Sequence, residues 1–455
     1  MFNLHRIYLR LNTGLEISFS QRRFLCLILS LIVVMLIDTS VVKIYEVIDK
    51  DFQIKIPLFS AGAILCLLLQ FFILKQVWKT FKTNQLQSKL QSAISLASLG
   101  ILSTLLTVMI FQLYFYNQYS SLITVAIIAI SYGTASVFII WLSWMFLTWY
   151  RSSRKLIIFL YSVSMWFIAF NLIMTAIFSS AKVSDRPDQI GSYVGGAGDM
   201  SGGRHVTIDF IYRVSSFTSF FALWFTTAML MASYRGGLLS VITYSIVLLI
   251  PLVYFIVTFF YQFILGPLLS SRTAVDPVTV TIILLAFLSL SKPIGGLVFG
   301  SAFWNIARTV SYEKRIKIYM FISGWGIFLI FAGNQATAQL TTPFPPFGIP
   351  TITVLTLAAY LVLIGIYNSA KLVSVNNILR KDIYQRALRP ELLHSIGRAE
   401  MERELQKTVN EIITSQDILG KEREIERVAK VEFDEKELRK YLDQVIEEVK
   451  RDRSS

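Results

Sequence analysis

Long apolar blocks recur along this chain and constrain its fold more than any other feature. Residues 24–36 read FLCLILSLIVVML, and residues 241–265 read VITYSIVLLIPLVYFIVTFFYQFIL. A helix rises about 1.5 Å per residue, so about 20 apolar residues are needed to cross a hydrocarbon layer of roughly 30 Å. Only 16% of the residues are charged, against about 25% in soluble domains. The blocks therefore predict an all-α, polytopic helical membrane protein embedded in the lipid bilayer.

The apolar blocks divide into about ten expected spans. They lie at residues 24–43, 56–78, 92–116, 122–149, 156–179, 214–233, 237–264, 278–307, 317–336 and 350–369. A count of nine or eleven is the alternative, because the eighth block is long and is interrupted by proline and glycine. The spans form an expected membrane domain over residues 1–369, with an outer loop at 180–213. A charged tail follows at residues 370–455.

The charges between the spans predict which side of the membrane each connection faces. If the N-terminus is cytosolic, the cytosolic connections carry sixteen Lys and Arg residues, opposed only by Glu16 and Glu313. Such an excess in short loops marks the cytosolic side, so we expect a cell-membrane protein with both termini in the cytoplasm. The net charge of +14 then orients helices and contacts anionic lipid. Because no basic stripe or binding motif occurs, we expect no nucleic-acid partner.

A glycine-rich stretch, YVGGAGDMSGGRHV at residues 193–206, resembles a phosphate-binding loop only superficially. Its glycine spacing departs from the dinucleotide fingerprint, and no P-loop lysine follows. The next residues, RHVTIDF, do not read as the start of a helix. Two interpretations stay open for this outer segment. It is either a flexible loop, since glycine frees the backbone to turn, or a ligand-sensing loop with contacts from Asp199, Arg204 and His205.

The few cysteine and histidine residues argue against catalysis and metal binding. Cys26 and Cys66 fall inside apolar spans, which disfavours a disulfide or a thiolate metal site. His5, His205 and His394 all lie outside the expected spans, so no intramembrane histidine is available to hold a haem. The chain has no nucleophile elbow, zinc-protease motif or calcium loop. We therefore expect no enzyme activity, no catalytic residues, no metal and no cofactor.

One charge interrupts the apolar interior of the eighth span, in LSLSKPIGGLVFGSAFWNIAR at residues 288–308. Lys292 lies near its centre, and charges at that depth mark functional sites by default. Pro293 removes a backbone hydrogen bond, and the glycines at 295, 296 and 300 permit close contact or a break. We expect a kinked or discontinuous helix, with Asp38, the only acid inside an expected span, as the partner of Lys292. In the alternative, Lys292 snorkels and Asp38 reaches water at the interface.

The charged tail predicts cytosolic helices with two short apolar repeats. The repeats are formed by Leu405, Val409, Ile412, Gln416 and Leu419, and by Leu438, Leu442, Val445 and Val449. Each covers only about two heptads, fewer than a firm coiled-coil prediction needs. The tail is therefore expected either to dock its amphipathic helices on one another or on the membrane domain, or to form a homodimer seam or a site for a protein partner.

This layout favours a non-catalytic signalling-input or scaffold component with a cytosolic helical tail. A salt bridge between Asp38 and Lys292 would then bias one of two helix arrangements. The first alternative is a secondary transporter or channel that uses a broken helix around Lys292 and Pro293. It is weakened because the span at 92–116, its counterpart in an inverted-repeat plan, has no proline and no charge. The second alternative is an accessory subunit of a membrane complex.

Overall fold

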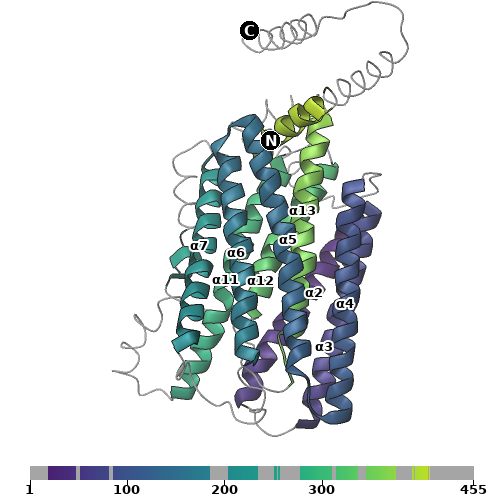
Figure 1. Ribbon diagram of the computed structural model, residues 1–455, viewed down its shortest axis with the longest axis vertical. Helices are drawn as coiled ribbons and strands as arrows, with labels where there is room; N and C mark the ends of the chain where they lie inside the picture. Colours follow the sequence, from purple (N-terminus) through teal and green to yellow (C-terminus); the bar gives the residue numbers. More distant parts are fainter. Residues whose placement is uncertain are drawn as a thin grey trace, which may run out of the picture. The chain divides into compact units, whose positions relative to one another are not determined.

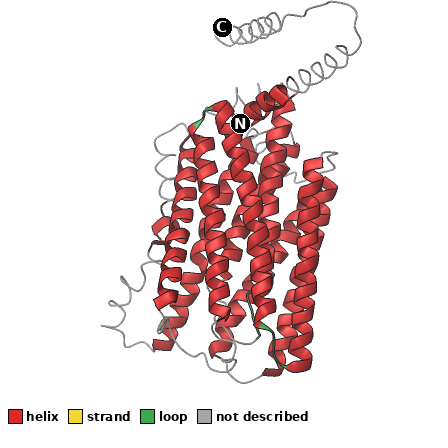
Figure 2. Cartoon of the chain, in the orientation of Figure 1, coloured by secondary structure: helices red, strands yellow, loops and turns green. Residues whose placement is uncertain are grey.

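The structure is a computed structural model that describes residues 19–47, 52–80, 86–184, 203–233, 249, 251–253, 255–256, 277–309, 314–336, 345–375, 392–393, 395–407 and 409. Within these ranges the chain is helical apart from short turns and contains no strand (Figure 2). Its long helices (Figure 1) are α2 (Phe19–Val47), α3 (Phe52–Thr80), α4 (Leu86–Tyr116), α5 (Ser121–Ser153), α6 (Leu156–Ser184), α7 (Gly203–Ser233), α11 (Pro277–Thr309), α12 (Lys314–Ala336) and α13 (Ile349–Val375).

The lengths and composition of these helices support a multi-pass helical membrane protein. Among the described residues, seven helices are long and apolar enough to cross a membrane, namely α3, α4, α5, α6, α7, α12 and α13. Helices α2 and α11 coincide with the expected first and eighth spans. The expected seventh span, at residues 237–264, lies almost entirely outside the described residues.

From α2 to α7 and from α11 to α13 successive helices run in opposite directions along the bundle, whereas α7 and α11 run in the same direction; the bundle thus has two ends. Helix α5 stops at a tight turn where Arg154, with φ 54°, donates its N–H to the Tyr150 carbonyl at 2.8 Å. We call this the Arg154 end. At the opposite end, residues 117–120 connect α4 to α5, and we call it the Ser121 end. The Phe178–Tyr212 contact places the start of α7 toward the Ser121 end. Two pairs of contacts show that α11 runs parallel to α7 and that α13 runs parallel to α5, so both also start toward this end.

Helix α13 is the central element of the bundle. Every side chain from Ile349 to Ala370 is buried. The helix packs against α12 and α5 most extensively, and also against α2, α3 and α4. A helix that is apolar on all sides belongs in the interior of a large bundle rather than at the lipid boundary. The position of α13 follows from its sequence, because charged side chains are absent between Ile349 and Ala370.

Polar side chains tie α13 to the helices that surround it. Three hydrogen bonds each join α13 to a different helix. Gln70 Nε2 of α3 donates to Thr353 Oγ1 at 2.8 Å. The hydroxyls of Thr134 in α5 and Thr356 lie 2.7 Å apart, as do those of Ser92 in α4 and Tyr360. Such bonds contribute to helix association where the surroundings give no hydrophobic drive. They fix the register of α3, α4 and α5 on the central helix.

Glycine contacts set the close crossing of α11, α12 and α13. A Cβ atom on Gly300 of α11 would lie 2.5 Å from the carbonyl oxygen of Gly324 in α12. A Cβ atom on Gly326 would lie 2.8 Å from the carbonyl oxygen of Ala358 in α13. Both contacts are with backbone, which cannot move aside as a side chain can. The close helix contact expected at Gly300 is therefore confirmed.

Adding one methyl group at this crossing is expected to destabilise the bundle. Gly326→Ala would force α12 and α13 apart, and overpacking of this kind costs about 1–3 kcal/mol. Gly133→Ala in α5 is the matched control, because a Cβ atom there meets nothing within 4 Å. Thermal unfolding in detergent should show a lower midpoint for Gly326→Ala than for Gly133→Ala. Equal midpoints would show that the two helices can separate without cost.

The chain divides into two compact units, residues 1–401 and residues 402–455. The division lies about thirty residues beyond the expected boundary at 369, because α13 continues to Val375 and residues 392–401 belong to the first unit. In the second unit, the described residues 402–407 and 409 are helical. Most of the two apolar repeats expected in the tail, and His394, lie outside the described residues.

Candidate functional site

The start of α7 lies nearer the N-terminus than the sequence suggested. The interpretation that RHVTIDF does not start a helix is wrong, because α7 begins at Gly203. Arg204 and His205 therefore occupy its first turn rather than a loop. The connection between α6 and α7 shortens from the expected 180–213 to residues 185–202. Asp199 lies outside the described residues, as do the side chains of Arg204 and His205.

Lys292 is buried between helices, as expected. Its side chain is 8% exposed. Its Nζ donates to the Tyr212 hydroxyl at 3.3 Å and lies 5.4 Å from the centre of the Tyr212 ring. An ammonium near an aromatic ring is attracted to the electron density of that ring. Tyr212 of α7 is therefore the partner of Lys292 within the described residues.

Helix α11 passes through Pro293 without interruption. It extends from Pro277 to Thr309 with this proline inside it, so the discontinuous helix that the sequence allowed is not found. The glycines that follow have a packing role instead. A Cβ atom on Gly295 would collide with the ring of Phe220 in α7, and one on Gly296 would lie 2.8 Å from Cβ of Phe331 in α12.

An aromatic pair supports Tyr212 from α6. The rings of Phe178 and Tyr212 are stacked, with centres 4.5 Å apart and an interplanar angle of 2°. On α6, Lys182 places its Nζ 4.5 Å from the centre of the Phe178 ring. We call Phe178, Lys182, Tyr212 and Lys292 the lysine–aromatic cluster. It joins α6, α7 and α11 toward the Ser121 end.

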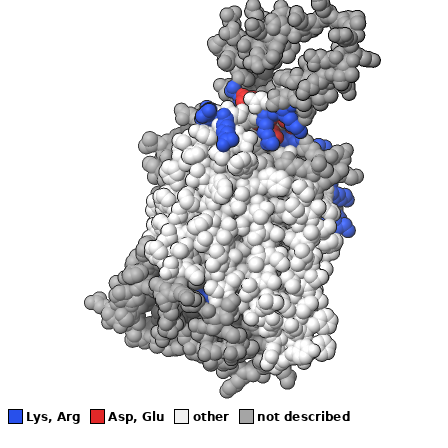
Figure 3. All heavy atoms as spheres, in the orientation of Figure 1, with Lys and Arg blue, Asp and Glu red and all other residues white. Residues whose placement is uncertain are grey.

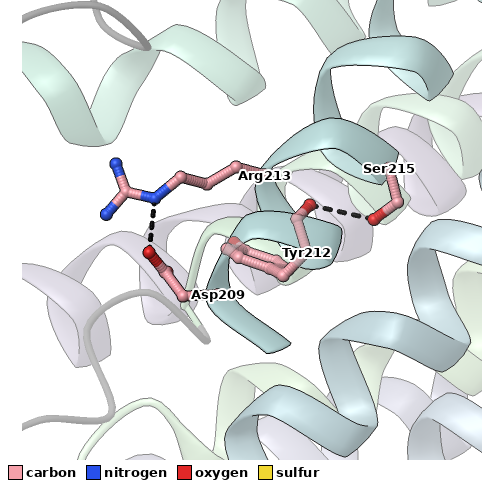
Figure 4. A network of polar contacts seen from close by, with 4 residues as sticks. All are labelled: Asp209, Tyr212, Arg213 and Ser215. Atoms are coloured by element: carbon pink, nitrogen blue, oxygen red, sulfur yellow. Dashed lines mark hydrogen bonds and ion pairs between the residues drawn. The ribbon is translucent and has the colours of Figure 1, made fainter. Parts of the chain in front are cut away.

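Next to the cluster, polar side chains of α7 bind one another and the helix backbone (Figure 4). Arg213 Nε donates to Asp209 Oδ2 at 2.7 Å, one helical turn away. Ser215 Oγ lies 2.9 Å from the Tyr212 carbonyl and 3.2 Å from Asn171 Oδ1 of α6. The carboxylate nearest Tyr212 in the sequence is thus engaged by Arg213.

Asp38 is buried, but its partners are on α13 rather than α11. Asp38 Oδ1 accepts the Gly348 N–H at 3.1 Å, and Oδ2 accepts the Thr351 N–H at 3.2 Å and the Thr351 hydroxyl at 2.6 Å. The first N–H groups of a helix have no partner within it, and they attract negative charge. Asp38 therefore caps α13, and the expected direct pairing with Lys292 is not found among the contacts of either residue.

A short helical segment beyond α13 is anchored at the Arg154 end. Glu400 is 4% exposed, and its Oε2 accepts the indole N–H of Trp149, near the end of α5, at 2.7 Å. A Cβ atom on Gly397 would collide with the side chain of Val373 in α13. Four apolar residues of the segment, Leu392, Leu393, Ile396 and Ala399, are buried, and Met401 is half-buried. We call residues 392–401 the anchor segment.

The sequence singled out Lys292 and Asp38 but missed Tyr212, Phe178, Trp149 and Glu400. Aromatic residues are frequent in this chain, so none of them stands out until its neighbours are known. Among the described residues, no group of three or more His, Cys, Asp or Glu side chains is arranged to hold a metal ion. Comparisons with protein-family models, curated proteins and solved structures found no match to this chain.

Proposed function

We propose that this protein is a non-catalytic signalling-input or scaffold component whose cytosolic tail, residues 402–455, binds a protein partner. The observation that carries the proposal is the buried bond between Trp149 and Glu400. It fixes the residues that immediately precede the tail to the membrane domain. A tail joined in this way can report the arrangement of the helices, or can be held in place for assembly.

Helix α13 provides the connection through the bundle in this proposal. Its 27 residues span about 40 Å at about 1.5 Å per residue. One terminus is capped by Asp38 of α2, and the anchor segment packs on Val373 near the other. Because α13 is buried along its length, a shift of its capped end would be transmitted to the anchor segment rather than absorbed by lipid.

The proposed topology has ten spans, with the Arg154 end and both termini in the cytoplasm. Helix α7 ends at the Arg154 end and α11 begins at the Ser121 end, which supports one further span between them. Described Lys and Arg residues gather mainly toward the Arg154 end (Figure 3). They include Arg22, Arg23, Lys79, Arg151, Arg154, Lys155, Arg308, Arg315 and Lys317. By the positive-inside rule, this end then lies on the cytoplasmic side of a cell membrane.

Cysteine labelling tests this topology in a chain whose native Cys26 and Cys66 are replaced by alanine. Ser201→Cys should react with a membrane-impermeant maleimide added outside intact cells. Lys155→Cys and Ser454→Cys should react only after permeabilisation, because both positions face the cytoplasm in the proposed topology. Labelling of Ser201→Cys only from the inside would reverse the orientation.

The scaffold proposal is tested by comparing the full chain with residues 1–401. Both proteins are cross-linked in native membranes, and their elution in detergent is compared to show that both are folded. The full chain should capture a defined partner, or a second copy, that residues 1–401 do not. If both proteins capture the same partners, the tail is not the binding element and an accessory-subunit role through the membrane helices is favoured.

The transporter alternative has lost its main structural support, because α11 is continuous through Pro293. It retains one specific observation, the buried ammonium of Lys292. A transporter should lose solute movement in reconstituted vesicles when Lys292→Met is introduced, while the protein still assembles. If vesicles that contain residues 1–401 still move solute, and the full chain captures no tail-dependent partner, transport is favoured over scaffolding.

A further inference from the structure

The lysine–aromatic cluster carries positive charge toward the Ser121 end, where the described Lys and Arg residues are fewer than at the Arg154 end. Lys182, Arg213 and Lys292 lie toward the Ser121 end on α6, α7 and α11. The acid of α7, Asp209, is already engaged by Arg213, and Asp38 of α2 is engaged by the start of α13. The contacts of Lys292 within the described residues are the hydroxyl and the ring of Tyr212, and neither is an anion.

Within the described part of the chain, the geometry of the pair leaves donors available for a ligand. Lys292 donates to the Tyr212 oxygen, so the phenolic proton remains available to a second acceptor. An ammonium has three N–H groups, so further donors remain on Lys292 as well. The stacked Phe178 ring holds the Tyr212 side chain in position. Tyr212 is half-buried, and its hydrogen bond with Lys292 is partly buried.

We propose that Lys292 and Tyr212 form a binding site for an oxyanion, either a phosphate or a carboxylate, that enters from the Ser121 end. The ligand would accept one hydrogen bond from the Lys292 ammonium and one from the Tyr212 hydroxyl. Lys182 is a further basic residue of the cluster, with its Nζ 4.5 Å from the centre of the Phe178 ring. The ligand is either a lipid headgroup or a small solute, since both present the same group. This site goes beyond the tail-dependent function and does not rely on it.

The test measures thermal unfolding of the full chain, purified in a neutral detergent, as ligand is added. One arm adds inorganic phosphate or acetate, and the other adds phosphatidylglycerol in mixed micelles, with phosphatidylcholine for comparison. At least one arm should raise the unfolding midpoint in a saturable way. A response to phosphatidylglycerol alone identifies a lipid headgroup, and a response to phosphate or acetate identifies a solute.

Two variants assign the response to the site. Tyr212→Phe keeps the ring stacking but removes the hydroxyl, and Lys292→Met removes the charge with little change in volume. Each should raise the half-saturating ligand concentration by about tenfold or more, because each removes a hydrogen bond that is charge-assisted in the complex. Lys155→Met, at the opposite end of the bundle, should respond as the wild type does. Absence of a saturable response in the wild type, or equal responses in wild type and Tyr212→Phe, would overturn the proposal.

Discussion

Asp38→Ala is expected to unfold in detergent well below the wild-type temperature. The carboxylate accepts three hydrogen bonds from the start of α13, and alanine leaves all three donors buried without an acceptor. Each such group costs about 1–3 kcal/mol, so the loss of stability should be about 3 kcal/mol or more. Asp38→Asn should be milder, because the amide oxygen still accepts one of these bonds.

Double-mutant cycles separate the cap from the salt bridge that the sequence suggested. Asp38→Asn combined with Thr351→Val should show a coupling of about 0.5–3 kcal/mol, because the two side chains are bonded directly. Asp38→Asn combined with Lys292→Met should be additive to within about 0.5 kcal/mol, because the two residues share no partner. Strong coupling of Asp38 to Lys292, with none to Thr351, would support the salt bridge and contradict the capping role of Asp38.

The apolar blocks predicted the helices well because the physics behind them is simple. A hydrocarbon layer requires long apolar helices, and the same blocks supply the described helices from α2 to α13. The sequence was less informative about which helices meet. Asp38 was matched to Lys292 because both are charged, whereas its partners are two backbone N–H groups and a threonine hydroxyl. Backbone donors occur at every helix start, so they cannot be recognised from the composition of the sequence.

The start of α7 was missed for a different reason. The residues Val206, Thr207 and Ile208 are β-branched, and such residues favour strands over helices. Tertiary contacts override this preference, because Tyr212 and Ser215 both bind residues of α6 once the helix forms. The anchor segment shows the same limit. Its apolar residues indicate a buried face, but the sequence does not identify Val373 and Trp149 as the surface that covers it.

Release of the anchor segment from the bundle is expected in Gly397→Leu. The larger side chain cannot occupy the position where even a Cβ atom collides with Val373. The segment must therefore separate from α13, and the bond between Trp149 and Glu400 is lost with it. Amide hydrogen exchange over residues 395–401 should become at least about tenfold faster, which corresponds to about 1.4 kcal/mol of local stability. Gly62→Leu in α3 is the control, because a Cβ atom there meets nothing within 4 Å.

Substitutions at the Trp149–Glu400 bond distinguish the bond from general packing. Glu400→Gln retains an acceptor for the indole N–H and should leave exchange nearly unchanged. Glu400→Leu leaves that N–H buried and unsatisfied, at a cost of about 1–3 kcal/mol. Its amide exchange over residues 395–401 should therefore be nearly as fast as in Gly397→Leu. If the tail reports the state of the bundle, Gly397→Leu and Glu400→Leu should also change partner capture by the full chain, while Glu400→Gln should not. Unaltered capture with fast exchange would mean that the tail binds its partner independently of the membrane helices.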